Sequence, residues 1–122
     1  MKEYIQSKIQ NIHVTDKSLH YDGSVTICPI LMNTVKIEPY QKVYIVNLNN
    51  GQRWSTYAIP GDLEIFQLNG GSARLGEIGD SCVVMAYKSS TRFEGACVVH
   101  TNKYNKIEKN IIYGNWMYTI RF

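Results

Sequence analysis

Short stretches of alternating or continuously apolar residues dominate the chain, and they predict a mainly β protein. In Ser24–Cys28, Val25 and Ile27 alternate with the polar Thr26, which is the period of a half-buried strand. Runs rich in β-branched and aromatic residues predict further strands at Lys42–Asn47, Arg53–Ile59, Glu64–Leu68, Ser81–Tyr87 and Ala96–Thr101. Helices are predicted only at Pro29–Val35, which has proline in its first turn, and at Ser72–Leu75.

Turn residues separate these strands at close intervals. Asn49-Asn50-Gly51 predicts a tight hairpin, because Asn and Gly tolerate the positive φ angles that such turns need. Pro60-Gly61 and Asn69-Gly70-Gly71 mark the ends of the two strands that follow. Many short strands with Gly and Pro corners favour a small closed barrel, which leaves no sheet edge exposed. The periodicity alone does not distinguish one type of barrel from another.

The C-terminal stretch Asn115–Phe122 carries a large aromatic face. Trp116, Tyr118, Ile120 and Phe122 alternate with more polar positions, as in a strand with one buried side. The stretch is interpreted either as a last strand packed on the barrel or as an interface with a partner or another subunit.

Composition narrows the class of protein. The 122 residues suit one domain, and 13 basic against 10 acidic residues give a net charge of +3 that is spread along the chain. We therefore expect neither nucleic acid nor a membrane as a partner, the more so as no apolar run approaches the ~20 residues of a bilayer span. Cys28, Cys82 and Cys97 show no CxxC spacing and suggest a reduced, cytoplasmic protein in which they serve as small apolar residues.

Several familiar chemistries find little support in the sequence. His13, His20 and His100 are not spaced as metal ligands on one element, so no metal site is predicted. No serine occupies a GxSxG turn, and Gly70-Gly71 lacks the lysine of a phosphate-binding loop.

A set of motifs is more informative when it is read together. Lys8, Leu19–Thr26 (LHYDGSVT), Arg53–Tyr57 (RWSTY) and Asn69–Ser72 (NGGS) occur in this order. With this spacing they resemble the pyruvoyl-dependent aspartate 1-decarboxylase family. The match runs from about Tyr4 to about Tyr87 and continues more loosely through residues 96–107.

The resemblance implies a six-stranded double-psi β-barrel with short helices, assembled as a homotetramer with active sites between subunits. It also implies a self-processing precursor that breaks between Gly23 and Ser24, converting Ser24 into a pyruvoyl cofactor without a metal. Residues 1–109 would form this decarboxylase domain, with 110–122 an additional C-terminal strand or interface segment. Whether a maturation factor takes part is left open.

The resemblance also assigns roles in processing. Gly23 has no Cβ, so its carbonyl is accessible to the Ser24 hydroxyl. Thr56 or nearby backbone N–H groups would stabilise the oxyanion of the acyl shift. His20 and Tyr21 flank the cleavage point, where they either assist proton transfer or serve the structure.

A second group of residues would act on the substrate, which forms a Schiff base at the position of Ser24. Arg53 and Lys8 would hold its carboxylates, the first as a planar fork and the second as a point charge. Tyr57 would donate the proton that replaces carbon dioxide. Asn69, Gly70 and Gly71 would line the pocket.

Some positions depart from the family pattern. Gln10 stands where many members have His, Asp22 replaces a common Glu, and Gly71-Ser72 replaces a frequent Ala-Ala. The region 88–95 is shorter than a frequent acidic helical segment, and the tail after Lys109 has no counterpart. We expect these changes to affect assembly and specificity more than the core chemistry.

The sequence thus predicts a cytoplasmic, self-cleaving decarboxylase that converts L-aspartate to β-alanine and carbon dioxide, for pantothenate and coenzyme A synthesis. One alternative is the same chemistry on a different acidic amino acid. The other is a non-catalytic barrel that binds a protein or a small ligand.

Overall fold

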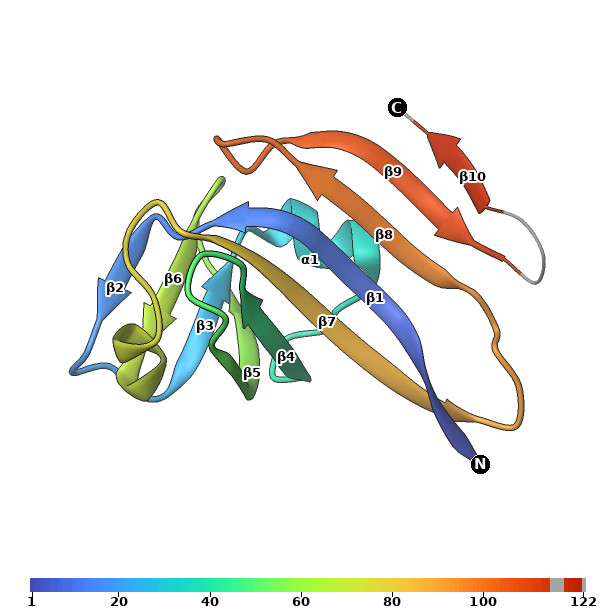
Figure 1. Ribbon diagram of the computed structural model, residues 1–122, viewed down its shortest axis with the longest axis horizontal. Coiled ribbons are helices and arrows are strands. Elements are labelled where there is room, and N and C mark those ends of the chain that lie inside the picture. Colours follow the sequence, from blue (N-terminus) through green and yellow to red (C-terminus); the bar gives the residue numbers. More distant parts are fainter. Residues whose placement is uncertain (115–117, 122) are drawn as a thin grey trace.

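The fold is mainly β, as predicted, with one short α-helix and one turn of 3-10 helix (Figure 1). The computed structural model describes residues 1–114 and 118–121. Its strands are β1 (Lys2–His13), β2 (Asp16–Ser18), β3 (Ser24–Ile27), β4 (Lys42–Asn47), β5 (Arg53–Pro60), β6 (Phe66–Asn69), β7 (Ser81–Ser90), β8 (Ala96–Thr101), β9 (Ile107–Tyr113) and β10 (Tyr118–Arg121). The helices are α1 (Pro29–Val35) and the 3-10 helix η1 (Gly70–Arg74).

The strands follow one another through hydrogen-bonded neighbours in the order β10-β9-β8-β1-β7-β4-β5-β3-β6-β2. Three of these pairings are parallel, namely β1 with β8, β3 with β5, and β2 with β6. The crossovers place β3 between β5 and β6, which is where the predicted cleavage point lies. With β10 and β2 at the two ends of this order, closure into a six-stranded double-psi barrel stays a prediction.

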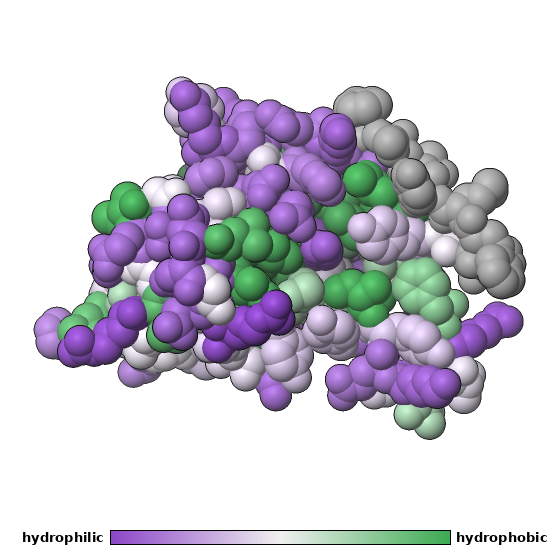
Figure 2. All heavy atoms as spheres, in the orientation of Figure 1, coloured by the Kyte–Doolittle hydropathy of each residue, from purple (hydrophilic) through white to green (hydrophobic). Residues whose placement is uncertain are grey.

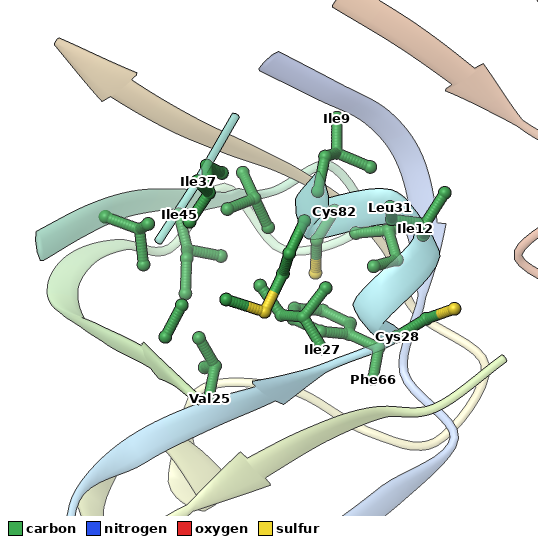
Figure 3. Close-up of a cluster of buried hydrophobic side chains, with 14 of the residues drawn as sticks. Ile9, Ile12, Val25, Ile27, Cys28, Leu31, Ile37, Ile45, Phe66 and Cys82 are labelled. Atoms are coloured by element: carbon green, nitrogen blue, oxygen red, sulfur yellow. The ribbon is translucent and has the colours of Figure 1, made fainter. Parts of the chain in front are cut away.

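The main core is formed by side chains of β1, β7, α1 and the four strands from β3 to β6 (Figure 3). Val25 and Ile27 of β3 are fully buried and pair in register with Leu68 and Phe66 of β6. Full burial of an aromatic side chain such as Phe66 contributes about 1.5–3 kcal/mol. Two of the three cysteines, Cys28 and Cys82, belong to this core, in agreement with their predicted role as apolar residues.

The helix α1 begins and ends where the sequence predicts. Pro29 occupies the first turn, where its missing N–H costs no helical hydrogen bond. Lys36 ends the helix in the left-handed region, at φ 65°, with its N–H bonded to the Asn33 carbonyl. Leu31, Met32 and Val35 face the core. At seven residues α1 is far too short to cross a bilayer, and no helix of the described residues could do so.

The longest strand, β1, was not predicted, because the set of alternate positions that faces the core changes along its length. Register shifts against β7 occur between Ile5 and Ser7 and again near Asn11, which has a φ of 68°. Ile9 before the second shift and Ile12 after it are both fully buried. An irregularity of this kind removes the strict alternation by which a strand is recognised in a sequence.

The other predictions differ from the structure mainly at element ends. The predicted strand at 64–68 begins later, at Phe66, since Glu64 adopts a positive φ of 65°. The Asn49-Asn50-Gly51 hairpin is confirmed, with Gly51 at φ 77° between the antiparallel β4 and β5. The predicted short helix at 72–75 is η1, which begins two residues earlier, at Gly70, and ends one residue earlier, at Arg74.

The predicted C-terminal strand is described only in part. β10 pairs antiparallel with β9, so a strand does form here. Trp116 and Phe122 lie outside the described residues, and so do the side chains that would form the aromatic face. The boundary expected at 109/110 falls within β9, and the division into 1–109 and 110–122 stays a prediction.

Candidate active site

Ser24 is the first residue of β3 and lies directly behind an exposed turn. Asp22 and Gly23 are exposed, whereas Ser24 retains only 1% of its accessible surface. The burial follows from strand pairing, because Ser24 is in register with Asn69 of β6 and the next residue, Val25, is in register with Ala58 of β5. The peptide between Gly23 and Ser24 therefore crosses from solvent into the interior.

Four hydrogen bonds surround the Ser24 hydroxyl and its partner Asn69. The Ser24 Oγ donates to the Asp22 carbonyl at 3.2 Å and accepts from the Asn69 Nδ2 at 2.9 Å. The same Nδ2 donates to the Thr26 Oγ1 at 2.9 Å. On its other side, the Asn69 Oδ1 accepts from the Gln67 Nε2 at 2.7 Å. The predicted pocket residue Asn69 thus contacts the predicted cleavage residue directly.

Gly70 and Gly23 approach each other closely at the predicted cleavage point. A Cβ on Gly70 would lie 2.9 Å from the Gly23 Cα and 2.9 Å from the Tyr21 carbonyl oxygen, and Gly70 has a φ of +60°. A side chain at position 70 would therefore push the turn away and strain the backbone. A Cβ on Gly23 or on Gly71 would meet nothing within 4 Å. Gly23 leaves the scissile peptide open, and Gly70 allows the close approach behind it.

Tyr57 occupies the neighbouring position on β5. Since Ala58 is in register with the buried Val25, the preceding residues Tyr57 and Ser24 share the opposite face of adjacent strands. The Tyr57 ring is half-buried and stacks on Tyr40, with 6.0 Å between the ring centroids. Tyr57 thus lies on the strand next to the predicted cleavage residue, and its ring is packed against a second aromatic ring.

Thr56 lies on the other face of β5. It is in register with the fully buried Val43, which places its side chain on the core side of the strand. None of the hydrogen bonds found among the described residues joins Thr56 to Ser24. Its expected part in processing stays a prediction.

Lys8 and Arg53 lie on one face of the sheet but at a distance from Ser24. Residues that are in register across β1, β7, β4 and β5 form rows that run across the sheet. One row consists of Lys8, Met85, Tyr44 and Ser55. The adjacent row on the same face consists of Gln10, Val83, Val46 and Arg53. We call the surface of these eight residues the outer face. Arg53 is four residues from Tyr57, about 13 Å along β5, and Lys8 is three strand spacings from Ser55, about 14 Å.

One copy of the chain therefore brings together only part of the predicted site. Ser24, Gly23, Asn69, Gly70 and Tyr57 converge at the start of β3. The two cations lie apart from them, because Ser24 is on β3, one strand beyond β5. The flanking His20 and Tyr21 are exposed, as is Gly71.

His100 adds an unexpected group beside Lys8. It is in register with Gln10, next to Lys8 on the same side of β1. Burial, together with the charges of Lys109 and Lys8, lowers the pKa of His100 below its ordinary value, and Glu108 opposes this only weakly. The imidazole is therefore neutral at pH 7. No group of metal-ligating side chains is found within the described part of the chain, His100 included.

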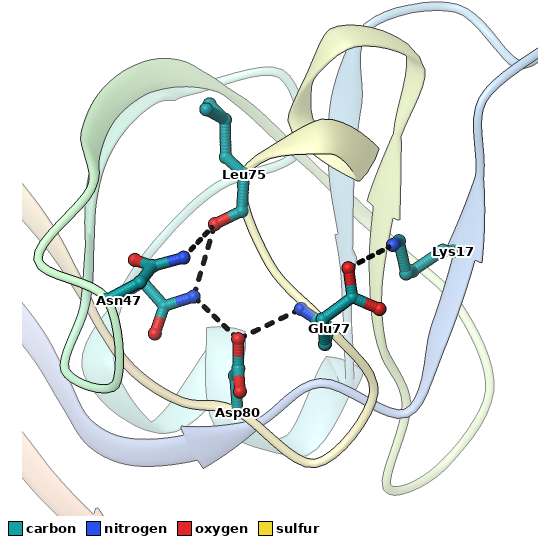
Figure 4. Close-up of polar contacts among 6 residues, drawn as sticks. Lys17, Asn47, Leu75, Glu77 and Asp80 are labelled. Atoms are coloured by element: carbon teal, nitrogen blue, oxygen red, sulfur yellow. Dashed lines mark hydrogen bonds and ion pairs between the residues drawn. The ribbon is translucent and has the colours of Figure 1, made fainter.

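A polar cluster fixes the loop that follows η1 (Figure 4). The fully buried Asn47 donates through Nδ2 to the Leu75 carbonyl at 3.1 Å and to the Asp80 carboxylate at 2.9 Å. Asp80 also accepts from the backbone N–H of Glu77 at 2.9 Å. These two bonds hold the pKa of Asp80 below its ordinary value. The cluster anchors the C-terminal end of the segment that carries Gly70.

Gln67 and Thr26 were not foreseen in the sequence. Both are polar residues at alternate positions of strands, which is the pattern of residues facing solvent. The contact of Thr26 with Asn69 depends on the pairing of β3 with β6, which brings together positions more than forty residues apart in the chain. Gln67 contacts Asn69 within β6, and the same pairing places that contact next to Ser24.

Comparison with known proteins places the chain among curated sequence relatives. The sequence profile of the aspartate decarboxylase family matches residues 1–108. An aspartate 1-decarboxylase of Salinibacter ruber is 39% identical over 111 residues, which cover 86% of this chain and 76% of the relative. Those of Clostridium novyi and Carboxydothermus hydrogenoformans are 40% and 41% identical and are covered over 90% and 87% of their lengths. The match over residues 1–108 and the identity to these relatives show that the chain belongs to the aspartate decarboxylase family.

Proposed function

We propose that this protein is a self-cleaving, pyruvoyl-dependent decarboxylase that converts L-aspartate to β-alanine and carbon dioxide. The observation that carries the proposal is the position of the Ser24 hydroxyl. It is buried, it is hydrogen-bonded to the Asp22 carbonyl and the Asn69 amide, and it lies next to the exposed residue Gly23. The substrate follows from the relatives, which are named aspartate 1-decarboxylase. We also propose a cytoplasmic location, where the free cysteines remain reduced.

Cleavage would begin with attack of the Ser24 Oγ on the Gly23 carbonyl carbon. The new C–O bond replaces the Gly23–Ser24 C–N bond, and the hydroxyl proton passes to the released nitrogen. Loss of the Ser24 Cα proton then breaks the Cβ–O bond and frees the Gly23 carboxylate. The elimination leaves a Cα=Cβ double bond beside the free amine, and this enamine would tautomerise to an imine as a proton moves from the nitrogen to Cβ. Water would hydrolyse the imine to a ketone and ammonia, so that residue 24 would end as a pyruvoyl group.

The residues around Ser24 suit these chemical steps. Gly23 presents an unshielded carbonyl, and the close approach at Gly70 keeps the turn in place. The Asn69 amide donates one hydrogen bond to the Ser24 hydroxyl. Because this donor is neutral, it positions the oxygen and weakens its nucleophilicity less than a cation would. Once formed, the pyruvoyl ketone supplies an electron acceptor of the kind that decarboxylation requires.

Binding and protonation of the substrate would fall to residues on two copies of the chain. Tyr57 lies beside residue 24 and would deliver the proton through its phenol. Lys8 and Arg53 are too distant within one copy, so we propose that a neighbouring subunit supplies them to bind the two carboxylates. Apolar side chains at the centre of the outer face, Tyr44, Val46, Val83 and Met85, would be covered in that assembly. Hydrophobic residues gather over the middle of β1 and β7 in Figure 2.

The finer architecture belongs to the same proposal. A homotetramer of six-stranded double-psi barrels would place the outer face of one barrel against the Ser24 turn of the next. The surface hollow of about 350 Å³ lined by Arg53, Tyr44 and Met85 supports a contact at this face.

An assay of purified, matured protein tests the proposal. Release of β-alanine from L-aspartate is expected, with none from the Ser24→Ala variant. Activity on another acidic amino acid, such as L-glutamate, in place of aspartate would show that the substrate is wrong. Binding without any turnover would favour a non-catalytic barrel.

A further inference from the structure

Gln67 contacts the cleavage machinery without touching Ser24. It lies on β6 two residues before Asn69, so the two side chains share one face of the strand. Its Nε2 donates to the Asn69 Oδ1 at 2.7 Å, the shortest of the three hydrogen bonds that the Asn69 side chain makes. Asn69 is fully buried, and no solvent competes for this contact.

The direction of the Asn69 carboxamide matters for Ser24. With Oδ1 turned to Gln67, both N–H groups of Nδ2 are used, one toward the Ser24 Oγ and one toward the Thr26 Oγ1. The reversed carboxamide would present its oxygen to the two hydroxyls, and its N–H groups would meet the Gln67 Nε2 unless the Gln67 carboxamide turned as well. The Nε2 donor of Gln67, in the orientation that the structure shows, therefore favours the orientation of Asn69 in which Ser24 receives a hydrogen bond.

That orientation leaves the Ser24 proton pointing at the main chain. Because Oγ accepts from Asn69, its own O–H is free to donate to the Asp22 carbonyl at 3.2 Å. The hydroxyl is thereby held beside the Gly23 peptide that it is to attack. A reversed Asn69 would draw the Ser24 O–H to itself and away from the turn.

We propose that Gln67 is a positioning residue for self-cleavage, acting through Asn69 on the Ser24 hydroxyl. This rests on the proposed function, since it assumes that Ser24 cleaves the chain. It goes further in assigning to Gln67 a role that belongs to maturation rather than to turnover.

The test replaces Gln67 by glutamate and follows the conversion of precursor into fragments by intact mass. The glutamate side chain has nearly the same shape, but when ionised it can only accept hydrogen bonds, so it favours the reversed Asn69. We expect cleavage of Gln67→Glu to be slowed about 10-fold to 100-fold near pH 7. Gln52→Glu, an identical change at an exposed turn, is the control and should cleave at the wild-type rate.

The pH dependence separates this role from a general loss of structure. A protonated glutamic acid can donate again, so the ratio of the Gln67→Glu rate to the wild-type rate should rise as the pH falls toward about 4.3. A ratio that stays low and constant between pH 8 and pH 5 would overturn the proposal, as would an unchanged rate at pH 7.

Two further outcomes have defined meanings. If Gln67→Glu does not fold, Gln67→Met decides, since it keeps the length and removes the donor. Folded Gln67→Met that cleaves at the wild-type rate would overturn the proposal, and slowed cleavage would support it. If the wild-type chain itself never cleaves, the proposed function fails, and the role of Gln67 fails with it.

Discussion

Tyr57 and Ser24 stand side by side at one register step of two parallel strands, yet the proposal gives them separate tasks. In the proposed function Ser24 would be consumed in maturation, whereas the Tyr57 phenol, half-buried against Tyr40, would act only afterwards. Residues that act at different stages can be separated by experiment, because cleavage and turnover are measured independently.

Replacing Tyr57 by phenylalanine should leave cleavage intact and impair turnover. The ring still stacks on Tyr40, but the proton donor is gone, and loss of general acid catalysis costs about 100-fold to 10,000-fold in rate. Intact mass and β-alanine release measured on the same sample give both quantities. Turnover at the wild-type rate would remove Tyr57 from its role.

Gly70→Ala should disturb the cleavage turn. The added methyl would lie 2.9 Å from the Gly23 backbone, and the φ of +60° adds a cost of about 1–2 kcal/mol for a residue with a side chain. We expect slower cleavage and a lower melting temperature. Gly71→Ala is the matched control, because its Cβ meets nothing within 4 Å. Equal effects of the two changes would contradict the close approach at Gly70.

At this scale the sequence pointed to three predicted site residues that the structure brings together, but not to the residues that contact them. Ser24, Asn69 and Tyr57 stand in motifs that are recognisable in a short stretch of chain. Gln67 and Thr26 gain their importance only when β3 pairs with β6, and no local pattern records that pairing.

Among the elements, η1 and the loop after it depend on a few polar contacts rather than on a regular ladder. Asn47 at the end of β4 binds both the Leu75 carbonyl and Asp80, so that one buried amide fixes the loop at two points. The anchoring reaches back to Gly70, the first residue of η1.

Asp80→Asn should reduce the acid sensitivity of the fold. The folded chain holds the pKa of Asp80 below its ordinary 3.8, mainly through Asn47. In the acid range the unfolded chain therefore binds more protons at this group, so the stabilisation is present above about pH 4 and is lost as the pH falls. Urea unfolding between pH 3 and pH 7 should give a shallower dependence for Asp80→Asn than for the wild type. The exposed Asp62→Asn is the control and should keep the wild-type pH dependence of the free energy of unfolding. The same pH dependence in Asp80→Asn would contradict this account.

Elements with a regular pattern were predicted well, and irregular ones were not. The hairpin between β4 and β5 carries its own turn signal in Gly51. In β1, the change of face near Asn11 mixes polar and apolar positions, so the longest strand leaves no alternating pattern in the sequence.

For the whole molecule, the separation of the two cations from Ser24 is the decisive feature. Lys8 and Arg53 belong to the outer face, whereas Ser24 lies on β3, the next strand after β5 in the sheet, and Tyr57 lies about 13 Å from Arg53 along β5. The resemblance placed all four in one site, but a sequence carries no record of which copy supplies each residue.

Co-expression of two inactive variants tests whether the site spans two copies. Arg53→Ala should cleave but bind aspartate poorly, and Ser24→Ala should neither cleave nor turn over. If Arg53 of one copy serves residue 24 of its neighbour, mixed assemblies contain some intact sites. Separately tagged and co-purified, they should regain activity well above that of either parent. Activity no higher than the parents would place the whole site within one chain.

The mass of the purified protein, taken before and after reaction with a hydrazine probe, tests the central claim most directly. We predict two polypeptides, one of residues 1–23 ending in a free carboxylate and one of residues 24–122 whose first residue bears a ketone that the probe modifies. A single polypeptide of 14.0 kDa that leaves the probe unreacted would contradict the account.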